Sequence, residues 1–432
     1  MRAGATATVF TNGRIVDGHR HIENGYLIMK GASIIAVGSG EPRRGFLSAS
    51  GARHIDLAGR TLLPGFIDCH VHLTMGAQAT PVPIVSPRDQ LVAVLAAATN
   101  ALRTLHAGVT TVRDCGAPHQ IDFALRRAAE EGLCLTPRLL LSGRALCMTG
   151  GHGWHLLGRE VDGVDGVRRC AREELKAGAD NIKLIASGGI LTQGTGIGNP
   201  QFTVAEMQAA VQEAHDAGKT ANAHAHGAEG IKRAAAVGVD SIEHGYFIDS
   251  EAIDMMLERG TFLVATSAAV RNVVSHGAAA GIPVHMVEKA QSAIHSHVAG
   301  FRSAHRAGIA LAMGTDSGVP FTHHGSNLDE LVHLFAMGLS PQEAIRVATL
   351  DSARLLKLED RIGSLDEGKI ADLVIIEGNP LDDIAVARSP ENIRCVVLNG
   401  RIVLDRDVGR ALVGAGFATE MGAGFQLGGG SG

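Results

Sequence analysis

The chain has few aromatic residues, no closely paired cysteines and no long apolar run. Phe, Trp and Tyr make up 3% of its 432 residues. The six cysteines are scattered without a C-x-x-C pair, which argues against a disulfide framework or a thiolate zinc site. No run of about 18 uninterrupted apolar residues occurs, and residues 1–10 lack the pattern of a secretory signal. These absences predict a cytoplasmic protein that does not associate with membranes.

The charge balance is also unremarkable. A net charge of −5 gives no basic surface for phosphate backbones, so we expect no nucleic-acid partner. A hydrophobic content of 45% is enough for a large core and excludes a disordered or fibrous chain. What stands out is 21 histidines and 55 glycines, which supply many imidazoles and many tight turns. Metal chemistry is therefore worth testing.

The two ends of the sequence share a pattern of short predicted strands and turns. Short β-rich segments separated by turn residues fill residues 7–60 and return at residues 371–404, where Asn399-Gly400 is a hairpin signal. We predict that residues 1–62 and 359–415 form one small β-sandwich domain. The Gly-rich residues 416–432 are expected to be a flexible tail.

Residues 63–358 alternate short β-branched strands with longer segments of helical period. Eight strands followed by helices over this length predict an α/β fold, a (β/α)₈ barrel. The expected strands are Gly65–Val71, Thr110–Arg113, Arg138–Ser142, Asn181–Ala186, Thr220–His224, Ser241–Glu243, Thr261–Ala265 and Ile309–Gly314. The expected helices are Arg88–Leu105, Ile121–Glu131, Gly163–Lys176, Val204–Ala217, Gly227–Val237, Ser250–Glu258 and Val287–Ala307.

In such a barrel the carboxyl ends of all strands open at one mouth, so polar residues there converge. The first strand ends in Asp68-Cys69-His70-Val71-His72, and two histidines spaced by two residues on a strand face the same side and can chelate one ion. The fifth strand ends in His224 and His226, the sixth in His244, and the eighth in Asp316. Five histidines and a carboxylate at one mouth predict a metal centre.

The fourth strand places Lys183 inside an apolar run. An ammonium group is costly there unless it is paired or neutralised. Two interpretations follow. The lysine could form a salt bridge with a barrel carboxylate, or its neutral amine could capture CO₂ as a carbamate that bridges two cations.

Together these segments resemble the amidohydrolase superfamily of metal-dependent barrel hydrolases, specifically its imidazolonepropionase-related and prolidase-like (Xaa-Pro dipeptidase-type) branch. The resemblance covers nearly the whole chain. The matching segments are residues 63–72, 149–153, Lys183, residues 224–227, 243–245, 314–316 and 363–373.

This resemblance implies a binuclear centre. His70, His72 and Asp316 would hold one divalent ion, usually zinc in this family, and His224 and His244 a second. Lys183, N6-carboxylated, would bridge the two ions together with a hydroxide. The carbamate charge then leaves the cluster at about +1, whereas an ammonium between two cations is untenable. Asp316 would be both ligand and proton shuttle.

Two further histidines are expected to contact the substrate. Relatives in this branch often carry tyrosine at the position of His226, where an imidazole N–H could donate to the reacting carbonyl. The alternative assignment makes His226 the metal ligand and His224 structural. The resemblance also implies that His152, in a Gly-rich loop, belongs to the substrate pocket. We expect that pocket to be built chiefly from the loops Thr74–Arg88, Cys147–Gly163, Leu191–Gln201 and Ala268–Pro283.

The resemblance implies a zinc-dependent amidohydrolase that cleaves a C–N amide bond of a small molecule. We expect a dipeptide or an N-acyl amino acid with a free carboxylate, or a xenobiotic amide such as ochratoxin, and a homo-oligomeric enzyme. Carbamate or urea hydrolysis is an alternative, as is a mononuclear cyclic amidohydrolase or deaminase. A non-catalytic scaffold would have lost metal ligands, and none is missing. Candidates for gripping a carboxylate are Arg113, Arg144, Arg159 and Arg271.

Overall fold

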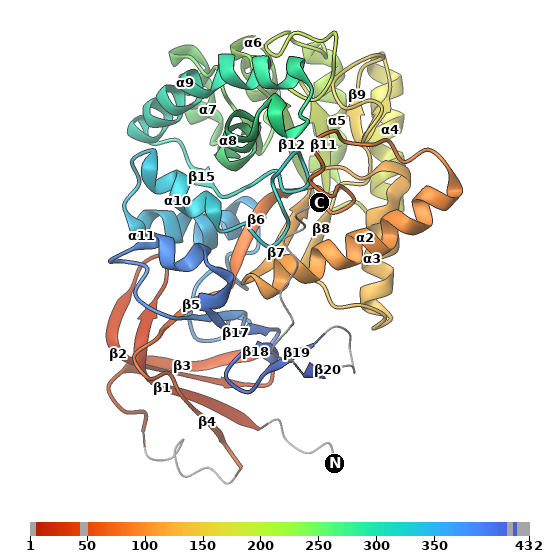
Figure 1. Cartoon of the computed structure of the whole chain (residues 1–432). Coiled ribbons are helices and arrows are strands. Elements are labelled where there is room, and N and C mark those ends of the chain that lie inside the picture. The colour runs from red at the N-terminus through yellow and green to blue at the C-terminus, as the bar shows by residue number, and fades with distance from the viewer. Residues whose placement is uncertain (1–5, 44–50, 413–417, 421–432) are drawn as a thin grey trace.

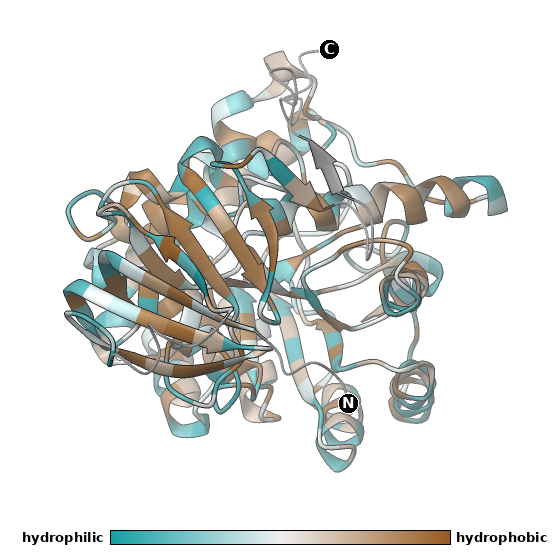
Figure 2. Cartoon of the chain, turned by 90° about the horizontal axis from the view of Figure 1, so that it is seen from below, coloured by the Kyte–Doolittle hydropathy of each residue, from teal (hydrophilic) through white to brown (hydrophobic). Residues whose placement is uncertain are grey.

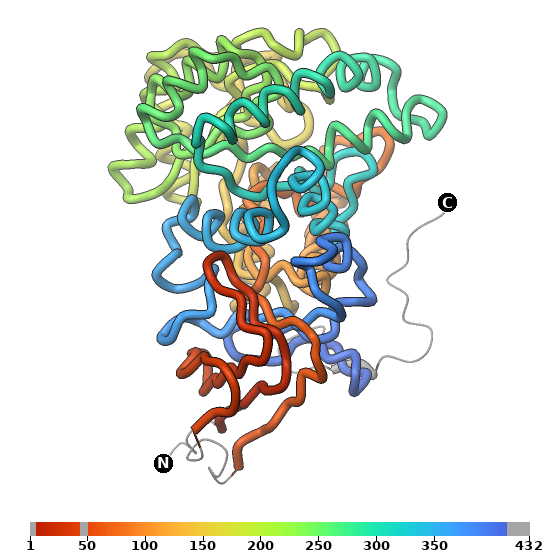
Figure 3. Tube along the Cα trace, turned by 90° about the vertical axis from the view of Figure 1, so that its left-hand side faces the viewer, coloured from red at the N-terminus to blue at the C-terminus, as the bar shows by residue number. Residues whose placement is uncertain are grey.

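The computed structural model describes residues 6–43, 51–412 and 418–420. The chain forms a barrel of alternating strands and helices with a sheet domain against one side of it (Figure 1). In the tube view the first and last parts of the chain lie together below the barrel (Figure 3). The (β/α)₈ barrel flanked by a sheet domain built from both ends, as expected from the sequence, is confirmed.

The barrel strands run parallel. Three of them form one ladder, β6 (Phe66–Val71), β7 (Val109–Asp114) and β8 (Arg138–Leu141). The others form a second ladder in the order β10 (Gly158–Glu160), β9 (Ala145–Cys147), β11 (Asn181–Ile185), β12 (Thr220–Ala225), β13 (Ser241–His244), β14 (Phe262–Val264) and β15 (Leu311–Ala312). Backbone hydrogen bonds close the barrel at both junctions of the two ladders. Beside β15, the Cys69 amide donates to the Met313 carbonyl and the Asp316 amide donates to the His70 carbonyl. Beside β8, the Asp180 amide donates to the Leu141 carbonyl.

Helices cover the outside of the barrel. They are α2 (Pro87–His106), α3 (Ile121–Glu130), α4 (Val164–Ala177), α5 (Val204–Asp216), α6 (Ala228–Ala236), α7 (Ser250–Arg259), α8 (Ser267–His276), α9 (Val284–Ala307), α10 (Asp329–Ala336), α11 (Pro341–Arg346) and α12 (Ser352–Leu355). Local sequence explains many of their ends. Ser86 and Thr203 form capping boxes at α2 and α5, and Gly178 and Gly308 end α4 and α9 in the left-handed conformation.

One predicted pocket loop is wrong. Residues Ala268–Pro283 were expected to be loop, but most of this stretch is α8, followed by a short 3₁₀ turn at Ala278–Ala280. Helix α8 begins directly after β14, and its N-cap residue, Thr266, lies in the left-handed conformation without a side-chain cap. The Thr266 hydroxyl donates to the Ala265 carbonyl and accepts no helix amide, so a residue type that usually caps helices does not act as a start signal here.

The sheet domain interleaves the two ends of the chain. Its strands are β1 (Ala7–Val16), β2 (His21–Lys30), β3 (Ser33–Ser39), β4 (Arg53–Asp56), β5 (Thr61–Pro64), β16 (Leu373–Ile376), β17 (Ile393–Leu398), β18 (Arg401–Asp405), β19 (Arg410–Leu412) and β20 (Ala418–Glu420). Strand β5 pairs with β1 on one side and with β16 on the other, so one sheet crosses both terminal segments. Apolar residues colour its strands brown in Figure 2.

The hairpin signal at Asn399-Gly400 joins β17 and β18, and both residues have positive φ. A Cβ on Gly400 would lie 1.9 Å from the Gly31 carbonyl oxygen, so only glycine fits there. The domain limits 1–62 plus 359–415 and 63–358 stay predictions, and the expected tail 416–432 lies mostly outside the described residues. Among the helices of the described ranges, none has the length and apolar character to cross a bilayer.

Candidate metal centre

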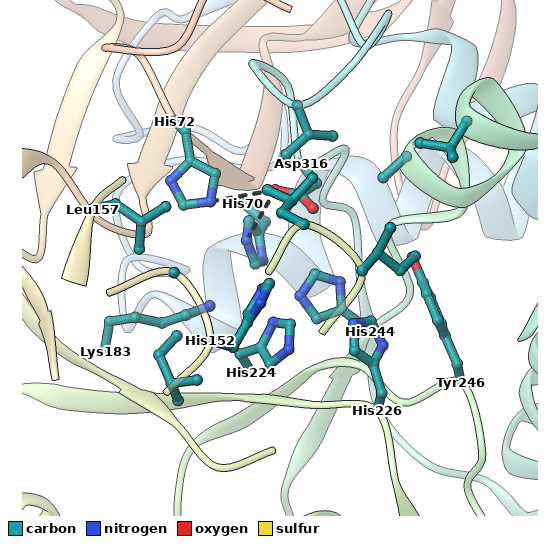
Figure 4. Close-up of a pocket in the computed structure, with 17 residues that line it drawn as sticks. His70, His72, His152, Leu157, Lys183, His224, His226, His244, Tyr246 and Asp316 are labelled. Carbon is teal, nitrogen blue, oxygen red and sulfur yellow. Dashed lines mark ion pairs between the residues drawn. The ribbon is translucent and has the colours of Figure 1, made fainter. Parts of the chain in front are cut away.

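All eight side chains predicted from the sequence line one pocket at the carboxyl ends of the barrel strands (Figure 4). His70 lies in β6 and His72 directly follows it, Lys183 lies in β11, His224 in β12 and His244 in β13. The remaining three are His152, His226 and Asp316, which lie in the loops after β9, β12 and β15. His244 and Asp316 both have positive φ, at 75° and 60°. Backbone strain of this kind is typical of functional positions.

The first group of potential ligands is His70, His72 and Asp316, whose ligand atoms lie within 4.8 Å of one another. The Nε2 atoms of His70 and His72 lie 3.4 and 3.3 Å from Asp316 Oδ1. The other nitrogens are already engaged, since His70 Nδ1 lies 2.7 Å from Glu243 Oε2 and His72 Nδ1 lies 3.1 Å from the Gly116 carbonyl oxygen. Both partners accept hydrogen bonds, so each Nδ1 carries the proton and each Nε2 lone pair faces Asp316.

The second group is His224, His226 and His244, again with ligand atoms within 4.8 Å of one another. His224 Nε2 donates to the Gly188 carbonyl at 3.2 Å, which leaves Nδ1 as its free lone pair. His244 Nδ1 lies 2.7 Å from Thr266 Oγ1, so Nε2 is its available nitrogen. His226 Nδ1 is buried without a hydrogen-bond partner among the described residues. The geometry brings all three imidazoles together and leaves both assignments of His226 open.

Lys183 lies beside these groups, and 2% of its surface is exposed. Its Nζ makes no hydrogen bond to any residue in the part of the chain that the structure describes. A buried ammonium without a partner is costly. Asp316 Oδ1 is likewise buried without a hydrogen-bond donor. Orphaned polar atoms of both kinds, surrounded by imidazoles, fit a site that holds divalent cations.

The electrostatics favour neutral forms of His70, His224, His226 and His244 and a charged carboxylate at Asp316. Burial, together with the charge of Lys183, lowers the pKa of His70 to about 4. Burial also lowers the pKa of His224, His226 and His244 well below the usual value. Burial would lower the pKa of His72 too, but its hydrogen bond to Asp316 raises that pKa above the usual value. Burial alone would raise the pKa of Asp316, but His70 and His72 bring it down to about 2. Neutral imidazoles and an ionised carboxylate are the forms that bind metals.

A third group, His70, Cys115 and Glu243, lies beneath the first. Burial raises the pKa of the Cys115 thiol to about 12, so it is not a thiolate ligand. Glu243 is engaged by Arg113, whose NH2 donates to Oε1 at 2.7 Å. This fully buried ion pair holds Glu243 in place, and Glu243 in turn orients the His70 ring.

Asp68 also positions the candidate ligands, and it was not among the residues predicted from the sequence. Its carboxylate accepts hydrogen bonds from the His70 and Thr315 backbone amides and from the Thr315 hydroxyl. It thus fixes the end of the first barrel strand to the loop that carries Asp316. An aspartate beside the H-x-H pair was the available signal, but its partner lies 247 residues away in sequence.

The rest of the pocket is aliphatic. Its apolar lining consists of Leu157, Ile185, Ile190, Leu191, Ala269, Val273 and Val319, with Tyr246 beside His226. None of the four candidate arginines belongs to this lining. Arg113 is buried against Glu243, Arg144 pairs with Glu174, and Arg159 pairs with Glu173.

His152 is held by the segment that follows β11. Thr192 Oγ1 lies 3.1 Å from His152 Nδ1 and accepts a hydrogen bond from the Gly153 amide. The hydroxyl can donate its own proton to His152 Nδ1, and in that arrangement the ring proton is on Nε2. Burial, with the charge of Lys289, lowers the pKa of His152 to about 3, so this imidazole is neutral.

A parallel barrel with two imidazole-rich groups and a carboxylate at its mouth defines a metal-dependent barrel hydrolase. The sequence pattern of the amidohydrolase family matches residues 61–403, so the chain belongs to that family. It is a hydrolase that acts on C–N bonds.

Individual relatives narrow the subfamily. The chain is 28% identical over 446 residues to ochratoxinase from Aspergillus niger, a match covering 94% of this chain and 88% of that one. It is 26% identical to imidazolonepropionase from Streptococcus gordonii, over 84% of this chain and 86% of that one. A crystal structure of a Xaa-Pro dipeptidase with bound methionine in the active site has 35% identity and a TM-score of 0.84, covering 92% of this chain and 99% of that one. The branch expected from the sequence is confirmed.

Proposed function

We propose that this protein is a binuclear zinc amidohydrolase that cleaves an amide bond next to an apolar group. The observation that carries the proposal is the pair of ligand groups, His70–His72–Asp316 and His224–His226–His244, with the unpartnered amine of Lys183 beside them. The alternative, a mononuclear cyclic amidohydrolase or deaminase, would hold one ion per chain.

His70, His72 and Asp316 would hold one ion, and His224 and His244 the other. Lys183, carboxylated on Nζ, would help to hold the ions as an anionic ligand. Donor sets rich in imidazole suit zinc. When bound, the ions would polarise the amide carbonyl and lower the pKa of water toward about 7, which makes a nucleophile available at neutral pH.

Asp316 is the residue that we propose moves the proton. Its pKa of about 2 keeps it ionised at neutral pH, so it can accept a proton from the attacking water. With 9% of its surface exposed at the pocket, it can then deliver that proton to the leaving nitrogen. The same carboxylate thereby serves as base and afterwards as acid.

His226 and His152 would contact the substrate as neutral N–H donors. His226 packs against Tyr246 with ring centroids 4.3 Å apart and ring planes tilted by 38°, and its lowered pKa keeps it uncharged. We propose that it donates to the carbonyl oxygen as negative charge develops there. His152, with its proton on Nε2, would be a second donor to the substrate.

The substrate that we propose is a dipeptide or an N-acyl amino acid with an apolar side chain, or a xenobiotic amide of similar character. The aliphatic lining of the pocket supports an apolar group, and a free amino acid is what the Xaa-Pro dipeptidase structure binds. The likeness to ochratoxinase supports ochratoxin as a xenobiotic substrate to test. Carbamates and ureas present the same carbonyl and are the second class to test.

We also propose that the enzyme is a homo-oligomer. Five aliphatic side chains on α2 and the segment before it are 62–74% exposed, namely Val82, Val85, Leu91, Val92 and Leu95. Residues 90–98 contain no charge, so two copies of this surface can meet without repulsion. We propose that this surface binds the same surface of a second copy of the chain.

The deciding experiment combines metal analysis with turnover. Zinc-loaded protein should contain two ions per chain and should hydrolyse N-acyl derivatives of leucine, methionine or phenylalanine faster than those of aspartate or lysine. A stoichiometry of one ion, together with turnover of cyclic amides or amidines only, would replace the proposal by the mononuclear alternative.

A further inference from the structure

The loop after β11 holds three of the pocket histidines at once. The Ser187 hydroxyl accepts the His226 backbone amide, the Gly188 carbonyl accepts His224 Nε2, and the Thr192 hydroxyl contacts His152 Nδ1. Residues Ile190 and Leu191 of the same loop line the pocket. We define residues 187–192 as the histidine-holding segment.

This segment lies very close to the site. A Cβ on Gly189 would lie 2.4 Å from the His152 ring, so the backbone and the imidazole are in direct contact there. A displacement of the segment by one ångström would therefore move His152 and the apolar wall together. The geometry of the pocket depends on whatever fixes this backbone.

One side chain from another element fixes it. Lys289, in α9, donates from Nζ to the Gly189 carbonyl at 2.9 Å and to the Thr192 carbonyl at 2.6 Å. These two acceptors flank Ile190 and Leu191, so a single ammonium group spans the part of the wall that faces the substrate. Hydrogen bonds to a charged donor are about twice as strong as neutral ones.

The packing around Lys289 supports the same role. Ile190 is buried in one apolar cluster with Met286, Val287 and Ala290 of α9 and Val273 of α8. Lys289 projects from the same helix and reaches polar backbone atoms that the cluster cannot satisfy. Apolar side chains and the ammonium thus hold the segment together.

We propose that Lys289 is a positioning residue that holds the histidine-holding segment, and through Thr192 orients His152, against the metal centre. The proposal rests on the proposed function for its catalytic consequence only. The ammonium acts by fixing the wall and makes no contact with the substrate carboxylate.

The test compares K289M with K289R and with the control E288A, which changes an exposed neighbour on the same helix. Hydrogen exchange of a peptide spanning residues 187–193 is measured without substrate, and metal content and thermal stability are measured in parallel. We expect exchange of this peptide to be about tenfold faster in K289M, partly restored in K289R and unchanged in E288A, with two ions retained throughout. Unchanged exchange in K289M would overturn the proposal.

Kinetics provide the second readout. In K289M, kcat/KM should fall about tenfold, mainly through KM, and by the same factor for an N-acyl amino acid and for its neutral amide. T192V should show a similar loss, and the double variant little more, because both variants act on the position of His152, which the segment holds through the Thr192 hydroxyl. A loss confined to carboxylate-bearing substrates would show that Lys289 binds the substrate and would overturn the positioning role. The exchange measurement uses no substrate, so its outcome stands even if the proposed reaction is wrong.

Discussion

Lys183 is the residue whose chemistry depends most on its surroundings. It is buried, without a hydrogen-bond partner among the described residues, and it shares the pocket with six imidazoles and Asp316. Conversion to a carbamate would replace an isolated cation by an anion that two metal ions can share. The modification would therefore remove the cost of burying the amine and help to assemble the site.

We expect K183A to lower kcat/KM by about a hundredfold or more, because the bridging group is lost. Small carboxylic acids such as propionate should restore part of the activity by occupying the space left by the side chain. The control is K176A, which removes an exposed lysine of α4. Activity in K183A equal to that of the parent enzyme would exclude a bridging role.

His226 has two candidate roles, and one variant separates them. H226F keeps a ring packed against Tyr246 but removes both ring nitrogens. If His226 donates to the carbonyl, both ions remain bound and kcat falls by about a hundredfold. Metal analysis and kinetics on Y246F serve as the comparison. Loss of one ion from H226F would instead make this residue a ligand.

Most of the candidate site could be predicted at the residue scale because each candidate ligand lies in a barrel strand or closely follows one. The H-x-H pair at His70 and His72 and the single polar residues at Lys183, His244 and Asp316 are visible in the pattern. The residues that position these side chains, Arg113, Glu243 and Asp68, could not be predicted in the same way. Arg113 looked like a carboxylate-binding residue, but it is buried against Glu243, 130 residues further on. The ion pair between Arg113 and Glu243 forms only when the barrel closes, so no local sequence pattern predicts it.

At the scale of elements, the long periodic helices and the buried strands were predicted within a few residues. Helix α8 was not, because it follows β14 without a capping side chain and contains three valines, which have modest helix propensity. Its position is set by tertiary contacts. The Glu330 carboxylate accepts the amides of Ser267 and Ala268 at 2.8 and 2.7 Å and so caps the helix from α10.

His106 joins two elements and makes their contact sensitive to acid. It ends α2, is buried, and its Nε2 donates to the Leu412 carbonyl of β19 at 3.1 Å. Burial lowers its pKa to about 4, whereas in the unfolded chain it is near 6.5. Below pH 6.5 the unfolded chain therefore binds a proton that the folded chain does not, and stability falls as the pH drops toward 4.

We expect H106Q to remove this part of the acid sensitivity, since glutamine can donate to Leu412 but does not titrate. Between pH 6.5 and pH 5 the parent protein should lose about 2 kcal/mol more unfolding free energy than H106Q does. Urea unfolding at the two pH values measures the difference. Equal losses in the two proteins would show that His106 is protonated in the folded state.

At the scale of the whole molecule, the sequence did not reveal where the exposed aliphatic surface on α2 lies. Homo-oligomerisation was expected, but the surface that would mediate it depends on which face of α2 the barrel leaves uncovered. That face carries Leu91, Val92 and Leu95, while Ala93, Ala97 and Ala101 of the same helix are buried.

We expect the double variant L91E/L95E to dissociate into chains of 44.9 kDa, with metal content unchanged. The control is L133E, which places a charge at another exposed leucine, 73% accessible. Size-exclusion chromatography with light scattering distinguishes the species. An unaltered mass for L91E/L95E would remove this surface as the interface.

The pairing of β5 with β16 has a consequence for synthesis on the ribosome. Strand β5 leaves the exit tunnel early, but its partner follows only after about 300 further residues, which takes roughly 15–60 s at ordinary elongation rates. For that time the nascent sheet has an open edge, and chaperones that shield such edges would determine how much of the enzyme matures.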